Sequence, residues 1–115
     1  FVLISNANRI AGFNNFHKDV KLDDGKFEVV FCNLTKKADV VRTLYHIATS
    51  NIESAKGFEF YKVDELDIKF VESCPSWCID GEKLESNNKT YKIRMVKDFN
   101  ILMPKKNVKK LFLDK

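Results

Sequence analysis

Two acidic residues flank a glycine at the end of an apolar run from Trp77 to Glu82. Glycine allows turn geometry that other residues resist, so Asp80 and Glu82 can both be held at the rim of a strand. Carboxylates placed in this way could act as a general base or acid. Asp-Gly is also the commonest signal for a hairpin, so the residues alone leave an ordinary turn and a catalytic edge both open.

Other familiar mechanisms do not fit the residue content. A glycosidase would also use two carboxyls, but Trp77 is the only tryptophan that could stack on a sugar. The chain contains no Gly-x-x-x-x-Gly-Lys-Ser/Thr and no Gly-x-Gly-x-x-Gly, so no phosphate-binding glycine loop is predicted. His17 and His46 have no recognisable nucleophile beside them. Catalysis by this chain would therefore depend on its acids.

Charge is unevenly distributed between a folded domain, residues 1–104, and a basic tail, residues 105–115. A chain of 115 residues, 44% of them apolar, can bury one core. Of 20 basic and 16 acidic residues, five bases and one acid lie in the tail, which leaves 15 of each in the domain. A neutral domain does not favour nucleic-acid binding. The tail could attract anionic lipid headgroups or be a solvated end.

The chain is expected to be a cytosolic piece of a longer protein. It begins with Phe1 instead of methionine, inside what reads as a strand. No apolar run approaches the length of about 20 residues that crosses a bilayer, and no signal peptide is recognisable. An odd number of cysteines, without zinc or redox spacing, favours a reducing compartment; they are Cys32, Cys74 and Cys78.

Hydrophobic periodicity predicts a mainly β, α+β fold. We expect an antiparallel β-sandwich or a barrel-like sheet with one crossover α-helix at about residues 36–52, for which Thr35 can be the N-cap. Residues 27–34 are apolar on both faces and suit a central strand. An irregular excursion over residues 9–26 closes at an Asp-Asp-Gly turn. Further strands are expected at residues 1–5, 58–60, 66–71, 77–79, 91–96 and 101–103.

Three motifs, in their order and spacing, resemble the C-terminal domain of diacylglycerol kinase-like lipid kinases. They are Ser5–Phe13, Asp19–Val29 and Ile79–Glu82, with the predicted helix between the second and third. The likeness spans about residues 2–103 and is greatest to the soluble bacterial enzymes, which are related to sphingosine kinases. It implies a two-domain kinase whose N-terminal domain carries a Gly-Gly-Asp-Gly-Thr nucleotide loop. This chain lacks that loop and looks like the second half only, with its N-terminal side incomplete.

The resemblance also implies roles for individual residues. An Asp-Gly turn matching Asp24-Gly25 would hold a structural Mg²⁺ through the Asp24 carboxylate and the main-chain oxygens of Lys21 and Lys26. Such an oxygen-rich turn suits Mg²⁺. The Asp-Gly-Glu motif would supply the general base for the lipid hydroxyl, either Asp80 or Glu82. Residues expected in the substrate cleft are Asn6, Asn8, Gly12 and Gly81.

The implied activity is ATP-dependent phosphorylation of diacylglycerol to phosphatidic acid. ATP would be bound mainly by the missing N-terminal domain of the same chain. The full-length protein, called the parent below, would be cytoplasmic and bind the membrane peripherally. A homodimer is compatible with this interpretation, and no nucleic acid is implied. Two alternatives stay open: a noncatalytic β-sandwich that binds a ligand or partner, and a related kinase that acts on a sphingoid base or a nucleotide cofactor. The isolated chain is expected to be inactive.

Overall fold

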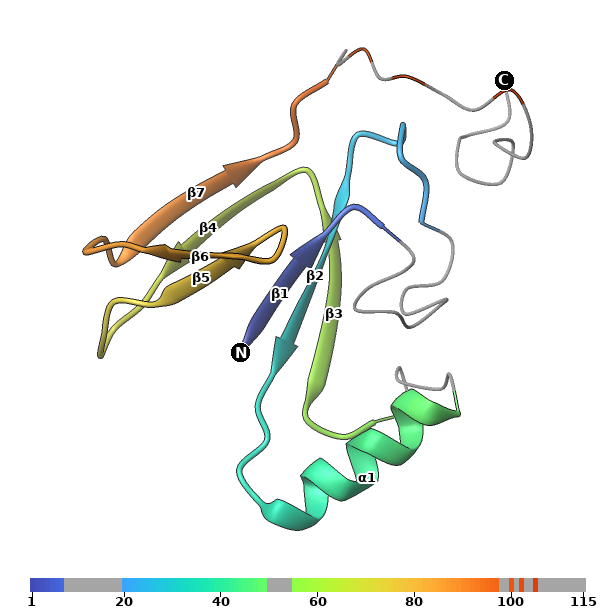
Figure 1. Cartoon of the computed structure of the whole chain (residues 1–115), viewed down its shortest axis with the longest axis vertical. Coiled ribbons are helices and arrows are strands. Elements are labelled where there is room, and N and C mark those ends of the chain that lie inside the picture. Colours follow the sequence, from blue (N-terminus) through green and yellow to red (C-terminus); the bar gives the residue numbers. More distant parts are fainter. Residues whose placement is uncertain (8–19, 50–54, 98–99, 101, 103–104, 106–115) are drawn as a thin grey trace.

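The computed structural model describes residues 1–7, 20–49, 55–97, 100, 102 and 105 (Figure 1). Within them the chain is mainly β, with antiparallel strands and one helix, which confirms the predicted α+β class. The elements in chain order are β1 (Val2–Ser5), β2 (Phe27–Cys32), α1 (Lys37–Ala48), β3 (Phe58–Val63), β4 (Glu65–Lys69), β5 (Ser76–Ile79), β6 (Glu82–Glu85) and β7 (Thr90–Arg94).

The strands form three separate sheets in the described part of the chain, not one barrel-like sheet. The largest is antiparallel, with the order β1-β2-β3. Strand β4 pairs with β7, and β5 pairs with β6 as a hairpin. Only Asp64 lies between β3 and β4, so the chain passes from the first sheet to the second at a bend (Figure 1).

Strand β2 is the centre of the first sheet and of the core. It pairs with β1 on one edge and β3 on the other, and both Val29 and Val30 are completely buried. Successive side chains of a strand point to opposite faces, so β2 is covered on both sides. The prediction of a central strand from two apolar faces is therefore confirmed.

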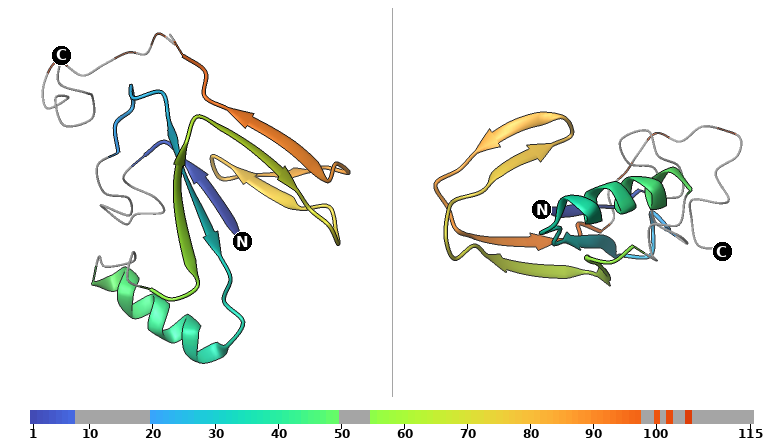
Figure 2. Two further views of the ribbon diagram at one scale, coloured as in Figure 1. Left: turned by 180° about the vertical axis from the view of Figure 1, so that it is seen from behind. Right: turned by 90° about the horizontal axis from the view of Figure 1, so that it is seen from below.

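An aromatic cluster attaches the β5–β6 hairpin to the second sheet. The ring of Trp77 on β5 lies 5.1 Å from that of Tyr91 on β7 and 6.0 Å from that of Phe70, which follows β4. The rings meet edge to face, an arrangement that adds about 0.5–1.5 kcal/mol per pair beyond the buried area. In the right-hand view of Figure 2 the ribbon of the hairpin lies apart from the other strands.

Helix α1 connects two antiparallel neighbours, β2 and β3, and lies at the end of their sheet (Figures 1 and 2). The carbonyl oxygen of Lys36 accepts the first helical hydrogen bond, from the N–H of Val40. Lys36 is therefore the N-cap, and the expectation for Thr35 is wrong. At the other end the Thr49 hydroxyl donates to the carbonyl oxygen of Tyr45 (3.0 Å). The predicted helix is thus present from Lys37 to Ala48, and residues 50–52 of the expected range lie outside the described residues.

The structure contains one strand that was not predicted, and one predicted strand lies mostly outside the described residues. Strand β6 was not expected, because its residues, Glu-Lys-Leu-Glu, are all exposed and give little hydrophobic pattern. The strand expected at 101–103 lies mostly outside the described residues.

Removing two methyl groups from the centre of β2 should destabilise the fold. We expect Val29→Ala and Val30→Ala each to lower the free energy of unfolding by about 2 kcal/mol, because both leave a cavity in a fully buried site. Urea denaturation measures this change. Val71→Ala is the matched control, since Val71 is 81% exposed and should change stability by less than about 0.5 kcal/mol. Equal effects at Val30 and Val71 would contradict the assigned core.

Candidate functional site

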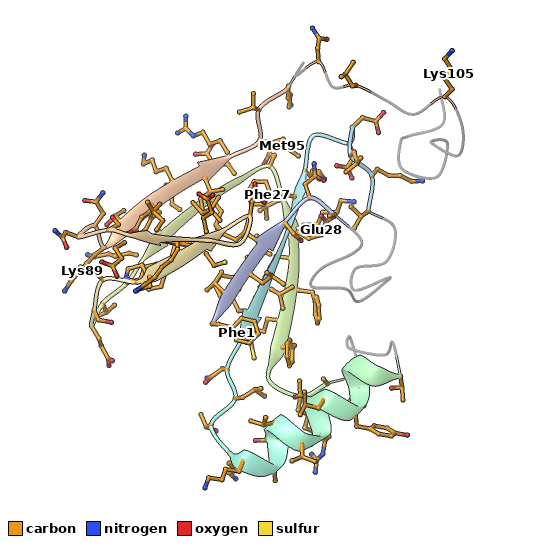
Figure 3. All side chains as sticks on the ribbon, in the orientation of Figure 1. Phe1, Phe27, Glu28, Lys89, Met95 and Lys105 are labelled. Carbon is orange, nitrogen blue, oxygen red and sulfur yellow. The ribbon has the colours of Figure 1, made fainter. Side chains whose placement is uncertain are left out.

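A row of three polar side chains crosses one end of the first sheet. The strand register places Ser5 of β1 opposite Glu28 of β2, and Glu28 opposite Lys62 of β3. Directly opposed residues of antiparallel strands have neighbouring side chains on the same face. Glu28 is only 6% exposed, which is unusual for a carboxylate. Figure 3 shows it near the end of β2 that follows the Asp24 turn.

The Lys62 ammonium bridges two carboxylates. Its Nζ lies 2.6 Å from Oδ2 of Asp24 and 3.5 Å from Oε1 of Glu28. The Asp24 side chain is 12% exposed and that of Lys62 is 39% exposed, so the pair is shielded from water more than an ordinary surface ion pair. The turn before β2 is therefore tied to β3 by charge as well as by chain connectivity.

Local backbone geometry sets the position of Asp24. The Lys26 N–H donates to Oδ1 of Asp24 at 3.0 Å, two residues on, which is the bond that makes Asp a turn former. Gly25 has φ +70°, and a Cβ there would lie 3.2 Å from Cε of Lys97. A side chain at this position would be strained in its backbone and crowded by Lys97. The predicted Asp-Gly turn is confirmed.

These contacts change the pKa values of the three charged groups. Burial raises the pKa of Asp24, but the Lys62 and Lys26 hydrogen bonds outweigh it and hold the pKa below its ordinary value. For Glu28 burial prevails over the attraction of Lys62, so its pKa is raised. The hydrogen bond to Asp24 raises the pKa of Lys62. At neutral pH the cluster thus holds one favourably ionised acid and one acid that is costly to ionise.

Three buried oxygen atoms at this end of the sheet lack a hydrogen-bond partner among the described residues. They are Oε2 of Glu28, Oγ of Ser5 and Oδ1 of Asn6. Buried polar atoms are nearly always paired, so a group of unpaired ones is unusual. Asn6 is among the residues expected in the cleft, and the structure places it directly after β1, next to this cluster.

The Asp80-Gly81 pair forms the two-residue turn of the β5–β6 hairpin. Ile79 pairs with Glu82 across it, and φ is 49° at Asp80 and 90° at Gly81. Positive φ at both central residues is the geometry of a type I′ turn, which Asp-Gly favours. Asp80 and Glu82 are exposed, and neither side chain has a hydrogen bond or ion pair to another described residue.

The structure does not join the two sets of predicted site residues. Within the described ranges, no hydrogen bond or ion pair links Asp80 or Glu82 to the Asp24, Glu28 and Lys62 cluster. The hairpin belongs to a different sheet from the cluster. Of the other predicted residues, Lys21 is half-buried and Lys26 is exposed. Asn8, Gly12 and the tail beyond Lys105 lie outside the described residues.

The oxygen donors at the Asp24 turn match the chemistry of Mg²⁺, with one complication. A carboxylate and the main-chain oxygens of Lys21 and Lys26 are hard ligands of the kind that Mg²⁺ binds alongside water. In this structure Oδ2 of Asp24 is bonded to Lys62. An ion at Asp24 would therefore have to displace the Lys62 ammonium. No cluster of three or more His, Cys, Asp or Glu side chains suited to a metal occurs in the part of the chain that the structure describes.

The residues that sequence reasoning missed are Glu28 and Lys62. Each lies between two apolar or aromatic neighbours in the sequence, which gives no indication that the two side chains meet. Only the register β1-β2-β3 sets them opposite each other. The one available signal was the charge of Glu28 near the start of residues 27–34, a segment that was expected to be covered on both faces.

Comparison with known proteins does not assign the chain to a family. No family model matches the chain, and no curated protein is significantly similar to it. Among the described residues, no helix has the length and apolar character needed to span a membrane.

The two acids of the cluster should affect stability with opposite pH dependence. Asp24 has a lowered pKa, so it stabilises the fold above its ordinary value of 3.8 and loses this effect as the pH falls through its folded-state pKa. Asp24→Asn should therefore cost about 1 kcal/mol at pH 7 and less below pH 3.8. Glu28 has a raised pKa, so its ionisation destabilises the fold as the pH rises above 4.5.

We accordingly expect the change in the free energy of unfolding caused by Glu28→Gln to be more favourable at pH 7 than at pH 4. Urea denaturation of both variants at pH 3, 4 and 7 measures the two trends. Effects that do not vary with pH in either variant would contradict the assigned electrostatics.

Proposed function

We propose that the chain is the C-terminal domain of a cytosolic, membrane-visiting lipid kinase that phosphorylates diacylglycerol to phosphatidic acid. The support is the order and spacing of the three motifs, two of which fall at turns where the backbone requires glycine. A nucleotide-binding domain elsewhere in the parent chain would hold ATP. The function rests on the resemblance together with the site chemistry.

One observation carries the proposal: the hairpin turn presents two acids that have no partner among the described residues. Asp80 and Glu82 lie at the free end of the β5–β6 hairpin, and neither is used to stabilise the described fold. Carboxylates without a structural partner can accept a proton from a substrate. The tight turn also limits their backbone freedom, so little ordering is needed when a substrate binds.

The carboxylate would act as a general base in phosphoryl transfer. As the lipid hydroxyl oxygen attacks the γ-phosphorus of ATP, its O–H bond breaks and the proton moves to Asp80 or Glu82. The new O–P bond forms while the bond from the γ-phosphorus to the bridging oxygen breaks, and ADP leaves. Phosphoryl transfer depends mostly on positioning and charge stabilisation, so one well-placed carboxylate is a sufficient chemical contribution from this domain.

The Asp24 cluster would have a supporting role. Asp24 and the main-chain oxygens of Lys21 and Lys26 would hold the proposed Mg²⁺. Bound there, the ion would fix the conformation of the turn that leads into β2. Without the ion, Lys62 supplies the positive charge at the same carboxylate. The cluster lies at the end of the sheet where Ser5, opposite Glu28, begins the first motif.

A noncatalytic binding module is the second candidate, and the hairpin geometry is compatible with it. Asp80-Gly81 has the conformation of an ordinary type I′ turn, which needs no catalytic explanation. The parent reading frame separates the two candidates. A kinase requires an upstream Gly-Gly-Asp-Gly-Thr, and a binding module does not.

Replacing the hairpin acids in the parent protein tests the proposed base. We expect Asp80→Asn or Glu82→Gln to lower ATP-dependent phosphorylation of diacylglycerol at least about 100-fold, as for a lost general base. Asp67→Asn on β4, also exposed, is the matched control and should retain activity. The isolated chain should show no activity. Wild-type turnover in both hairpin variants would refute the proposal.

Magnesium binding can be followed through thermal stability, without catalysis. An ion that binds only the folded chain raises the melting temperature as its concentration increases. We expect Mg²⁺ to stabilise the unsubstituted chain, to stabilise Lys62→Met more strongly, and to have no such effect on Asp24→Asn. Lys62→Met removes the competing ammonium, and Asp23→Asn controls for the loss of a charge in the same turn. An equal response to Mg²⁺ in Asp24→Asn and Asp23→Asn would rule out the site.

A further inference from the structure

Helix α1 turns its apolar side away from the protein. Val40, Val41, Leu44 and Tyr45 are spaced one and four residues apart and so share one face, and their side chains are between 44% and 69% exposed. Thr43, on the other side of the helix, is buried. A helix of a soluble domain normally shows the reverse arrangement, with the apolar stripe inside. The apolar face of α1 is therefore available for binding.

Positive charge accompanies this face. Lys37 is four residues before Val41 and seven before Leu44, so it lies on the apolar face. Lys36, four residues before Val40, and Arg42, three residues before Tyr45, border that face. All three bases are exposed, and none forms an ion pair with a described residue. The helix contains a single acid, Asp39, which is four residues before buried Thr43 and so on the inner side. The outer face is apolar and basic with no acid.

We propose that the outer face of α1 docks onto a membrane surface that contains anionic lipids. An amphipathic helix with apolar residues on one side and bases around them lies at the boundary of headgroups and acyl chains, where tyrosine is also favoured. Each base near an anionic surface contributes on the order of 1 kcal/mol. Figures 1 and 2 place α1 at the extremity of the molecule, beyond the end of the β1-β2-β3 sheet, where a flat surface can reach it.

Charge decides between a membrane and a protein partner. The buried centres of protein interfaces are poor in lysine, because a desolvated ammonium needs a partner. Lys37, on the apolar face itself, would enter such an interface without an ion pair to any described acid. At a membrane the same side chain extends to the phosphate groups while Val41 and Leu44 reach the acyl region. The combination fits an anionic lipid surface better than a second domain.

Vesicle binding by the full chain tests the docking face. We expect co-sedimentation with vesicles of phosphatidylcholine and phosphatidylglycerol (3:1), and at least about tenfold weaker binding to phosphatidylcholine alone. Val41→Ser/Leu44→Ser and Lys36→Glu/Lys37→Glu should each weaken binding to the anionic vesicles at least about tenfold. The changed side chains are exposed, so the fold should persist, as circular dichroism can verify.

Matched controls use the same substitutions elsewhere. Val71→Ser, also at an exposed valine, and Lys69→Glu/Lys92→Glu on the second sheet should bind as the unsubstituted chain does. Wild-type binding by both helix variants would overturn the proposal and assign any binding to another region, such as the basic tail. Absence of vesicle binding, with hydrogen-exchange protection of α1 by another domain of the parent, would instead make this face a domain interface and also overturn it.

Membrane docking by α1 extends the proposed function, on which it rests for its biological setting, and the two can fail separately. Vesicle binding needs neither ATP nor the nucleotide-binding domain. Vesicle binding that depends on α1, together with full activity of the Asp80→Asn and Glu82→Gln parents, would refute the general base and leave the docking face intact. Loss of activity in those parents without vesicle binding would do the opposite.

Discussion

The double-sided burial of β2 is the constraint on which the rest of the structure depends. Because β2 is hydrogen-bonded along both edges and covered on both faces, a charged residue in its sequence cannot avoid the interior. Glu28 is that residue. Its carboxylate is tolerable only near a positive charge, which Lys62 supplies from the neighbouring strand, and Lys62 in turn holds Asp24. The buried charge in β2 is thus linked through Lys62 to the turn that enters the strand.

The two acidic regions of the molecule use their carboxylates differently. In the Asp24 cluster both acids are ion-paired with Lys62, and the ionised form of Asp24 stabilises the fold whereas that of Glu28 does not. The hairpin acids, Asp80 and Glu82, are exposed and form no hydrogen bond or ion pair with another described residue. A proton acceptor must be free to meet its substrate, and a structural acid must not. This difference assigns the proposed chemistry to the hairpin and the support of the backbone to the cluster.

Helix α1 and the hairpin illustrate how far local pattern predicts structure. The period of the apolar residues correctly indicated a helix, and Asp80-Gly81 correctly indicated a turn, because both depend on backbone preferences within a few residues. The same period places Val40, Val41 and Leu44 on one face of the helix, and the structure shows that these side chains are exposed. Periodicity identifies a common face but not what covers it. Strand β6 escaped prediction since exposed strands carry little apolar signal.

The sequence by itself determined the mainly β class, the central position of β2, the helix and the two glycine turns, all of which follow from residue type and short-range spacing. Only the tertiary structure decided that Lys62 meets Asp24 and Glu28, that the apolar face of α1 is exposed, and that the strands form three sheets. Residues 28 and 62 are far apart in the chain, and their contact depends on strand register. Register is set by the packing of whole strands, which no local pattern encodes.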